Sequence, residues 1–424
     1  MIDYHRLGIM PKKNHIWMRN EQGHLYQEHC LTRAGFEKAY SILYHHHPPT
    51  VELATAASPL DGTDFVPQAL PNGELDFPRR RRHVDTCLHK PGETWLGNRK
   101  AMMYNDDIVV SIARPVENSP EFFSNGDADE LVFFQEGSGR LESVFGVVDF
   151  QQGDYVLIPR ATVHRFVFDF AKSPVYAMVF EGLEDIQVPP YFRNEFGQLK
   201  LDAPYCHRDF KRPERLCWDP ATPLPTAPEG HGFRLVIKRV GRLSDHVMKH
   251  YPLDVVGWDG WVYPIAFNIM DYQPKTGQIH LPPTSHTTFS SACGIHGEHC
   301  RYVICSFVPR KVDYHERSIP CPYNHSSPDC DEILFYVRGN FTSRKGIHPG
   351  SISLHPTGLP HGPHPGAYEA SIGSTETHEL AVMMDTFKPL RLTRYGASIE
   401  IGDYHETWIP NGTAPKPVEL LTGL

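Results

Sequence analysis

The amino-acid sequence predicts an all-β protein built from two related β-barrel lobes. The first observation is the high content of residues that end helices and strands: 33 Gly and 38 Pro in 424 residues favour short strands over long helices. Apolar segments of strand length recur between these residues, as expected for small barrels and jelly rolls. Finally, one pattern of acid, glycine, proline and histidine occurs twice along the chain.

The repeat has two parts in each copy. Asp129–Gly137 and Asp331–Gly339 both read acid, acid, four apolar residues, two other residues and glycine. Segments 153–164 and 350–361 both begin with Gly, place Pro six residues later and end in His. This spacing, with an acid upstream, resembles the cupin superfamily. The resemblance implies a double-stranded β-helix that occurs twice.

The two copies differ at one position. Seven residues before the shared acid, the second copy has His325 and the first has Phe123. The first copy keeps Glu130 and His164, but two such ligands seldom hold iron alone. We therefore predict a metal-free first lobe that serves packing or subunit contact.

The second copy supplies the candidate metal ligands His325, Glu332 and His361. Two imidazoles and one carboxylate leave three open positions on an octahedral ion, which is the arrangement of non-haem Fe(II) oxygenases. O2 and a bidentate dihydroxylated aromatic ring need adjacent positions on one metal. The triad therefore predicts Fe(II) and ring opening by a dioxygenase reaction. Isomerisation or hydrolysis on Mn(II) or Zn(II), and a non-enzymatic binding protein, are the alternatives.

Further histidines are candidates for proton transfer and substrate contact. A phenol binds Fe(II) best as phenolate, so a nearby base would assist binding. His280 and His286 lie in an extended segment just before the iron lobe and are both candidates. His355, on the strand leading to the Pro turn, suits a role behind the ligands or facing the substrate.

Composition limits the partners. The hydrophobic fraction of 40% and charged fraction of 21% are ordinary for a soluble protein. The net charge of −9 argues against nucleic acid or an anionic membrane as the main partner. No apolar run approaches the ~20 residues that span a bilayer, and no export signal follows Met1. We expect a cytoplasmic protein whose nine cysteines are reduced thiols, with the run Arg79–Arg82 as a solvated or subunit-facing strip.

Several segments together resemble the homogentisate 1,2-dioxygenase family, bacterial branch. They are residues 6–15, 41–49, 307–315, 323–325 and 350–363. The resemblance implies that His325, Glu332 and His361 bind the metal. It also implies that His280 is the catalytic base, with His286 as the second choice, and that His355 lies near the substrate.

The resemblance implies a reaction and an assembly as well. Homogentisate and O2 would give 4-maleylacetoacetate in tyrosine and phenylalanine catabolism, and the chain would form a homo-oligomer, a trimer or hexamer. One residue departs from the family: nine positions after Glu332, where the family has a substrate-contacting Tyr, this chain has Phe341. Arg344 could receive a carboxylate, and Tyr323 and His361 are further candidate substrate contacts. Gentisate or another substituted hydroquinone is therefore an alternative substrate.

We expect five parts along the chain. Residues 1–100 form N-terminal strands and extensions on the first lobe, and 101–185 form the degenerate metal-free lobe. Residues 186–275 form a connecting and subunit-contact segment, 276–395 the Fe(II)-binding lobe, and 396–424 a C-terminal tail.

Overall fold

A computed structural model describes residues 2–70, 79–219, 222–228, 231–276, 286–294, 297–341 and 343–409. Strands dominate these residues, and the all-β prediction is confirmed. The helices are short: α1 (Trp95–Asn98), α2 (Ala367–Ser371), α3 (Arg394–Ser398), and the 3-10 helices η1 (Thr86–Leu88), η2 (Pro190–Phe192), η3 (His207–Asp209), η4 (Ile269–Asp271) and η6 (Tyr404–Trp408). None of the helices in the described ranges is long and apolar enough to cross a membrane.

The first lobe consists of two sheets that face each other. The smaller contains β4 (Glu52–Ala57), β8 (Phe122–Asn125), β10 (Gly139–Ser143), β11 (Gly146–Phe150), β13 (His164–Phe168), β16 (Phe233–Arg239) and β17 (Arg242–Met248), in the order β11-β10-β13-β8-β16-β17-β4. The larger contains β6 (Lys100–Tyr104), β7 (Ile108–Ala113), β9 (Asp129–Glu136), β12 (Asp154–Ile158), β14 (Tyr176–Gly182), β15 (Phe210–Lys211), β19 (Ile265–Asn268) and β27 (Arg391–Leu392), in the order β15-β19-β12-β9-β14-β7-β6-β27. Aromatic side chains fill the space between the sheets; Phe134 stacks on Phe150 with ring centroids 4.1 Å apart.

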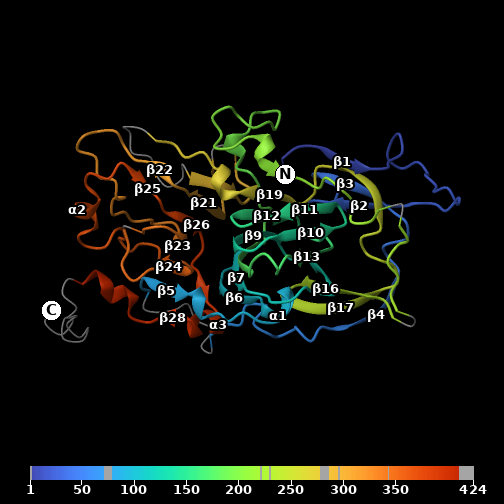
Figure 1. Cartoon of the computed structure of the whole chain (residues 1–424), viewed down its shortest axis with the longest axis horizontal. Coiled ribbons are helices and arrows are strands. Elements are labelled where there is room, and N and C mark those ends of the chain that lie inside the picture. Colours follow the sequence, from blue (N-terminus) through green and yellow to red (C-terminus); the bar gives the residue numbers. More distant parts are fainter. Residues whose placement is uncertain are drawn as a thin grey trace.

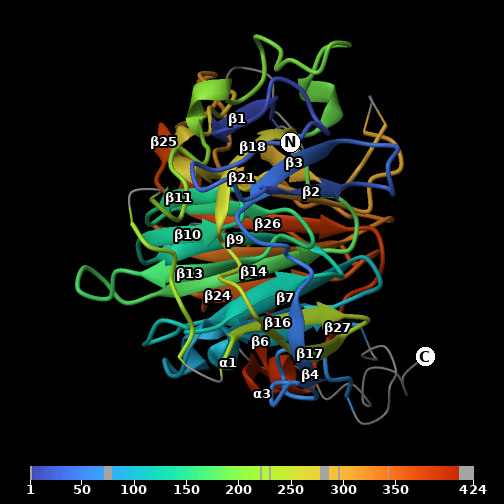
Figure 2. The ribbon, with the colours of Figure 1, turned by 90° about the vertical axis from the view of Figure 1, so that its right-hand side faces the viewer.

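The second lobe is built on one main sheet and a small one. The main sheet contains β5 (Arg82–Asp85), β20 (Thr287–Ser290), β21 (Tyr302–Phe307), β23 (Asp331–Arg338), β24 (Ser351–His355), β26 (Leu380–Thr386) and β28 (Glu400–Ile401), in the order β20-β21-β26-β23-β24-β5-β28. The small sheet pairs β22 (Arg310–Lys311) with β25 (Glu376–Thr377). Strands of both lobes are seen in Figure 2, with β14 and β9 of the first lobe and β24 and β26 of the second.

A separate four-stranded sheet lies at the N-terminal end of the first lobe (Figure 1). It contains β1 (His5–Gly8), β2 (Gln27–Thr32), β3 (Tyr40–His45) and β18 (Val255–Gly260), in the order β1-β18-β3-β2. Trp258 of β18 is fully buried and donates its indole N–H to the carbonyl of Phe145, 2.7 Å away. This contact fixes the sheet against the first lobe.

Two strands cross between the lobes. β5, from the N-terminal hundred residues, pairs with β24 and β28, and Figure 1 shows it in blue among the orange and red strands. In return, β27 from the C-terminal part pairs with β6 of the first lobe. The N-terminal segment thus packs on both lobes, because its strand β5 completes the sheet of the second.

Strand registers confirm the repeat that defines the two-lobed cupin fold. Glu332 of β23 lies opposite His355 of β24 and opposite Asp385 of β26. In the first lobe, the matching residue Glu130 lies opposite Ile158 and opposite Glu181. The same backbone framework therefore carries both sets of side chains.

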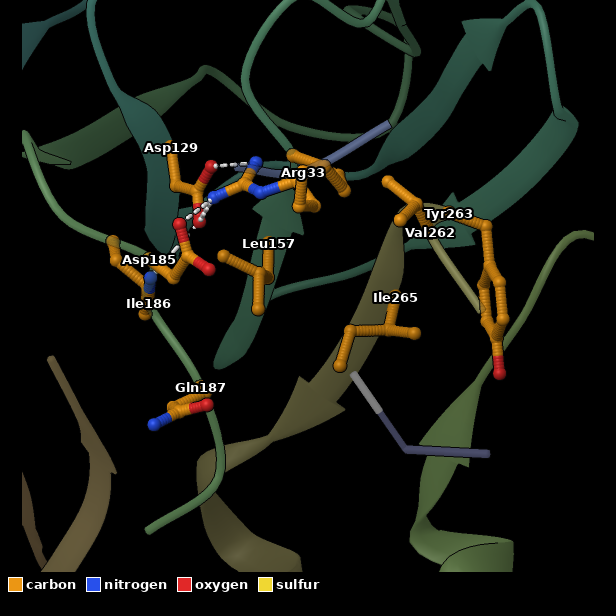
Figure 3. Close-up of a pocket in the computed structure, with 10 residues that line it drawn as sticks. Arg33, Asp129, Leu157, Asp185, Ile186, Gln187, Val262, Tyr263 and Ile265 are labelled. Atoms are coloured by element: carbon orange, nitrogen blue, oxygen red, sulfur yellow. Dashed lines mark hydrogen bonds and ion pairs between the residues drawn. The ribbon is translucent and has the colours of Figure 1, made fainter. Parts of the chain in front are cut away.

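The acid that precedes each of these glutamates is held in the same way in both lobes. Arg33 donates to Asp129 at 2.7 Å and also pairs with Asp185 at the rim of a small pocket lined by Leu157 and Ile265 (Figure 3). In the second lobe, Arg79 pairs with Asp331, which is fully buried. Buried carboxylates need such cationic partners, so each lobe fixes its first strand acid with an arginine from an N-terminal segment.

Two sequence expectations are corrected here. The arginine run is not simply a solvated or subunit-facing strip, because Arg79 pairs with buried Asp331 and Arg82 pairs with Glu400 inside this chain. The cysteines are not all reduced thiols, because Cys293 and Cys300 form a disulfide.

Candidate metal centre

His325, Glu332 and His361 meet at one end of the second lobe. His325 and His361 form an antiparallel bridge in which each backbone N–H donates to the other carbonyl at 2.8 Å. This bridge sets the two imidazoles side by side, with ring centroids 4.3 Å apart. Glu332 projects from β23, and its two carboxylate oxygens lie 3.7 Å from the Nε2 atoms of His325 and His361. The structure thus brings the three predicted ligands together.

Hydrogen bonds orient both imidazoles. His325 Nδ1 lies 3.2 Å from the carbonyl of Tyr323, and His361 Nδ1 lies 2.9 Å from that of Leu359. A carbonyl accepts only from a protonated nitrogen, so in each neutral ring Nε2 carries the lone pair and faces Glu332. The distances of 3.7 Å from Nε2 to the carboxylate exceed a hydrogen bond.

The donor set fits a divalent ion. His361 Nε2 is buried and has no hydrogen-bond partner in the described part of the chain. Buried polar atoms without a hydrogen-bond partner are rare, and such an atom is suited to bind an ion. Burial opposes the charged form of Glu332, but interactions with His325 and His361 outweigh burial and hold the pKa of Glu332 below its usual range. An ionised carboxylate with two neutral imidazoles is the donor set that Fe(II) oxygenases use.

The equivalent position in the first lobe is occupied by protein cations. Arg99 is fully buried and donates to Glu130 at 2.6 Å and to Glu181 at 2.7 Å. Lys238, also buried, pairs with Glu181. Phe123 lies opposite His164 in the register that joins His325 to His361 in the second lobe. These side chains supply the positive charge that an ion would supply, and the metal-free first lobe stays a prediction.

His355 lies directly behind the candidate ligand His361. The two rings are stacked with centroids 4.8 Å apart and an interplanar angle of 21°. His355 is fully buried, and its Nε2 lies 3.1 Å from the hydroxyl of Ser353. Burial, followed by the charge of Arg344, lowers the pKa of His355 well below its usual value. A neutral ring at this position fixes the orientation of His361 without adding charge.

Arg344 lies beside the ligands on the C-terminal side of Phe341. It donates to the carbonyl of Gly362, the residue after His361, at 2.6 Å. Within the described ranges it forms no ion pair with a carboxylate, and its Nε has no hydrogen-bond partner. Burial opposes its charge, but Tyr336, Tyr404 and Glu332 outweigh burial, so the pKa of Arg344 is raised. A half-buried permanent cation without a carboxylate partner among the described residues is suited to receive an anionic group.

The two predicted aromatic contacts differ in accessibility. Phe341 is 7% exposed and packs edge-on against Tyr336, with ring centroids 4.7 Å apart. Tyr323 is 45% exposed, and its ring lies 6.3 Å from that of His325. Phe341 is therefore buried close to Arg344, whose backbone N–H donates to the Phe341 carbonyl at 3.0 Å, whereas Tyr323 is exposed beside the candidate ligand His325.

The two candidate bases are not equally placed. His280 lies outside the described residues. His286 is buried and stacks on Phe307 with ring centroids 4.6 Å apart. Burial, followed by the charge of Arg310, lowers the pKa of His286 to about 3. So low a pKa makes a poor proton acceptor near neutral pH, which favours His280 as the predicted base.

A C-terminal segment contributes side chains that the sequence pattern did not indicate. Trp408 of η6 stacks on His364, with centroids 3.8 Å apart, and also approaches His355 at 6.4 Å. Arg81 lies over the Trp408 ring at 4.8 Å and donates to the carbonyl of Pro360, the residue before His361. These residues come from opposite parts of the chain, so no local motif could have indicated their meeting.

Asp385 is a second acidic residue that sequence reasoning missed. It lies opposite Glu332 in the pairing of β23 with β26. Burial and the charge of Glu332 raise the pKa of Asp385 to about 8. The corresponding residue of the first lobe is Glu181, so comparison of the two copies beyond β24 would have indicated this position.

Comparison with known proteins identifies two matching family models. The model described as homogentisate 1,2-dioxygenase N-terminal matches residues 109–269. The model described as homogentisate 1,2-dioxygenase C-terminal matches residues 276–413, which contain all three candidate ligands. Together the two models cover most of the chain.

Individual relatives agree with these matches. A Saccharolobus solfataricus protein with the provisional name of dioxygenase is 36% identical over 96% of this chain and 99% of its own length. The homogentisate 1,2-dioxygenase of Nitrobacter hamburgensis is 26% identical over 82% of this chain and 74% of its own length. Among solved structures, Bacillus subtilis oxalate decarboxylase is 11% identical, with a TM-score of 0.33, over 74% of this chain and 78% of that chain.

Proposed function

Because the chain belongs to the homogentisate 1,2-dioxygenase family and is a dioxygenase, we propose that it opens the ring of homogentisate with O2 on Fe(II) held by His325, Glu332 and His361. The observation that carries this proposal is the pair of Nε2 lone pairs directed at Glu332, with the His361 nitrogen buried and without a hydrogen-bond partner among the described residues. The product would be 4-maleylacetoacetate, formed in tyrosine and phenylalanine catabolism.

The bound Fe(II) would supply redox chemistry and adjacent positions for O2 and the phenolic oxygens. The protein would supply orientation and charge. Arg344 would receive the substrate carboxylate, since it is a half-buried cation that lacks a carboxylate partner among the described residues. Arg344 also donates to Gly362, next to ligand His361, so the carboxylate and the metal-bound end of the substrate would be held by one rigid turn.

Proton transfer in this proposal belongs to His280. It would take a proton from a substrate hydroxyl, because a phenolate binds the metal better than a phenol does. His286 is less suited to this step, since its ring is stacked on Phe307 and its pKa is lowered to about 3. His355 would hold His361 in place through ring stacking.

Phe341 supports a second candidate substrate. It lies in the wall near Tyr336, where its ring offers no hydroxyl to a bound ligand. A dihydroxylated ring with a different substituent, such as gentisate or another substituted hydroquinone, would lose less from this absence than homogentisate. Both substrates would bind the same metal site, so the two hypotheses differ in the substrate ring and not in the three proposed ligands.

An oxygen electrode tests the proposal directly. Protein loaded anaerobically with Fe(II) should consume O2 when homogentisate is added, and mass spectrometry should detect a ring-opened product with both oxygen atoms. O2 uptake with gentisate or methylhydroquinone, but not with homogentisate, would show that the alternative dihydroxylated ring is the substrate. No uptake with any dihydroxylated ring, in protein shown to contain one Fe(II) per chain, would contradict the proposal.

A further inference from the structure

We propose that Asp85, Cys87 and His348 form a second metal site, which binds Zn(II) and is separate from the iron ligands. One donor atom from each residue lies within 4.8 Å of the other two. A carboxylate, a thiolate and an imidazole are all ligands of Zn(II), a borderline-soft ion. The thiolate distinguishes this donor set from the oxygen and nitrogen donors of His325, Glu332 and His361.

The donor atoms are already oriented towards one another. His348 Nδ1 lies 3.0 Å from the carbonyl of Pro349, so Nε2 carries the lone pair of the neutral ring. This Nε2 lies 3.4 Å from Asp85 Oδ2, which is longer than a good hydrogen bond. Ligands bound tetrahedrally at about 2.0–2.3 Å are separated by roughly 3.3–3.8 Å. The observed separation is therefore suitable for a shared ion.

The surroundings fix the three ligands. The second oxygen of Asp85 accepts the backbone N–H of Cys87 at 3.0 Å, which begins η1 and ties the two ligands together. Cys87 Sγ donates to the carbonyl of Pro349 at 3.3 Å, so the thiol already faces the turn that carries His348. Hydrogen bonds of this kind, made by the ligands to the protein, orient metal sites and tune their affinity.

Gly350 leaves the space that the thiol occupies. Its φ of +91° lies in the left-handed region, and a Cβ built there would lie 2.6 Å from Cys87 Sγ. A side chain at this position would therefore displace the sulfur. Burial raises the pKa of the Cys87 thiol, while the Tyr176 hydroxyl lowers it. Metal binding would displace the thiol proton to solvent, as it does at other cysteine ligands.

This cluster lies far from the iron ligands along the same strand. Asp85 pairs with Ser351 at the first residue of β24, whereas Glu332 pairs with His355 at its last residue. Four residues of extended strand separate these positions by about 13 Å. One ion therefore cannot serve both sites, and the second site is available when the first is filled.

The proposed ion would have a structural role. Asp85 is the last residue of β5, the N-terminal strand that completes the sheet of the second lobe, Cys87 follows in η1, and His348 lies in the turn before β24. Zn(II) would link these two segments, in addition to the hydrogen bonds that pair β5 with β24. With two anionic ligands its charge would be neutralised, and a water could fill the remaining position. His348 is 47% exposed on its side chain, so the ion could enter from solvent.

Cobalt provides the decisive test, because Co(II) replaces Zn(II) and a thiolate ligand gives a near-ultraviolet charge-transfer band. Metal-free, reduced full-length protein is titrated with Co(II), and the same samples are melted with and without Zn(II). We expect a band in wild type, its loss in Cys87→Ser, and at least about tenfold weaker binding in His348→Gln. In the Glu332→Gln background, which removes the anionic residue of the other candidate site, Zn(II) should raise the Tm, and adding Cys87→Ser should abolish this effect.

Two matched variants separate this site from others. Cys30→Ser removes another exposed thiol and should keep the band. Glu332→Gln should lose cobalt at the iron ligands but keep the thiolate band. Absence of the band in wild type, or its persistence in Cys87→Ser, would overturn the proposal. The ring-opening proposal is independent, since it depends on O2 uptake and not on this band.

Discussion

Arg99 lies against Glu130 at 2.6 Å, and this ion pair occupies in the first lobe the position that Glu332 and its histidines occupy in the second. The pair is fully buried and continues to Glu181 at 2.7 Å. One ancestral framework has therefore been filled in two ways, by a protein cation in one lobe and by a predicted metal ion in the other.

Replacing Arg99 by Leu should destabilise the protein by about 3–5 kcal/mol, because Glu130 and Glu181 would be left buried without this cation. Urea unfolding followed by fluorescence measures the change. Arg215→Leu is the control, since Arg215 pairs with Asp149 at the surface, where an ion pair contributes at most about 1 kcal/mol. Equal effects of the two replacements would show that the buried network is not important for stability.

Glu332→Gln should abolish iron binding and O2 uptake, because the site would lose its anionic ligand. Glu130→Gln is the matched change in the first lobe and should lower stability while iron content is retained, because Glu130 contacts Arg99 and not a metal. Metal analysis and an oxygen electrode measure both variants. Iron retained by Glu332→Gln, or lost from Glu130→Gln, would contradict this division of roles between the lobes.

The roles of the residues that recur in both copies could be predicted from the sequence. The roles of Arg99 and Lys238, which occupy the candidate metal position in the first lobe, could not. The spacing of Gly350, Pro356 and His361, repeated from the first copy, predicted the fold, and together with the acid-containing segment it indicated the candidate metal ligands. Arg99 and Lys238 are separated along the chain and meet Glu181 only because strands from different segments close one barrel. Nothing in a local pattern marks an arginine as the partner of a carboxylate distant in sequence.

The same reason explains the misinterpreted arginine run. Four adjacent arginines look solvated when they are considered alone. Arg79 and Arg82 instead pair with Asp331 and Glu400, which lie more than two hundred residues later, because β5 is inserted between β24 and β28. Pairing between distant strands was not visible in the sequence, and it also brings Arg81 to Trp408.

Phe341→Tyr tests whether the Phe at this position gives the protein a different substrate preference from relatives that have Tyr there. A hydroxyl at this position would lie near Tyr336 and could donate to a bound carboxylate. We expect kcat/KM for homogentisate to rise by roughly tenfold, the effect of one hydrogen bond to a charged group. Phe387→Tyr, at an exposed position, is the control. An unchanged or lower kcat/KM would mean that the hydroxyl has no substrate group to meet.

Arg344→Met should raise KM for homogentisate by roughly ten- to hundredfold, since one charge-assisted contact to the carboxylate is lost. Methylhydroquinone, which has no carboxylate, should show little change, so the ratio of the two KM values isolates the charge. Lys345→Met removes the adjacent exposed cation and should leave both values unchanged. Equal losses for both substrates would assign Arg344 to the structure of the site and not to carboxylate binding.

His89 should make stability depend on pH below neutrality. Its Nε2 lies 2.7 Å from the Asn98 amide oxygen and its Nδ1 lies 2.5 Å from the Tyr395 hydroxyl, so the neutral ring donates once and accepts once. Burial lowers the pKa of His89 to about 4, below the unfolded value of 6.5. The unfolded chain therefore binds more protons between these values, and stability is lost as pH falls through this window.

We expect this residue to contribute about 2 kcal/mol to the loss of stability between pH 7 and pH 5. The measurement is the free energy of unfolding in urea at several pH values, for wild type and His89→Gln. The variant should show a smaller slope over this window, because its amide does not titrate. His15→Gln, at a side chain that is 97% exposed, should keep the slope of wild type. An identical slope in His89→Gln would mean that other buried groups account for the acid sensitivity, since the ring of His89 would then titrate alike in the folded and unfolded chains.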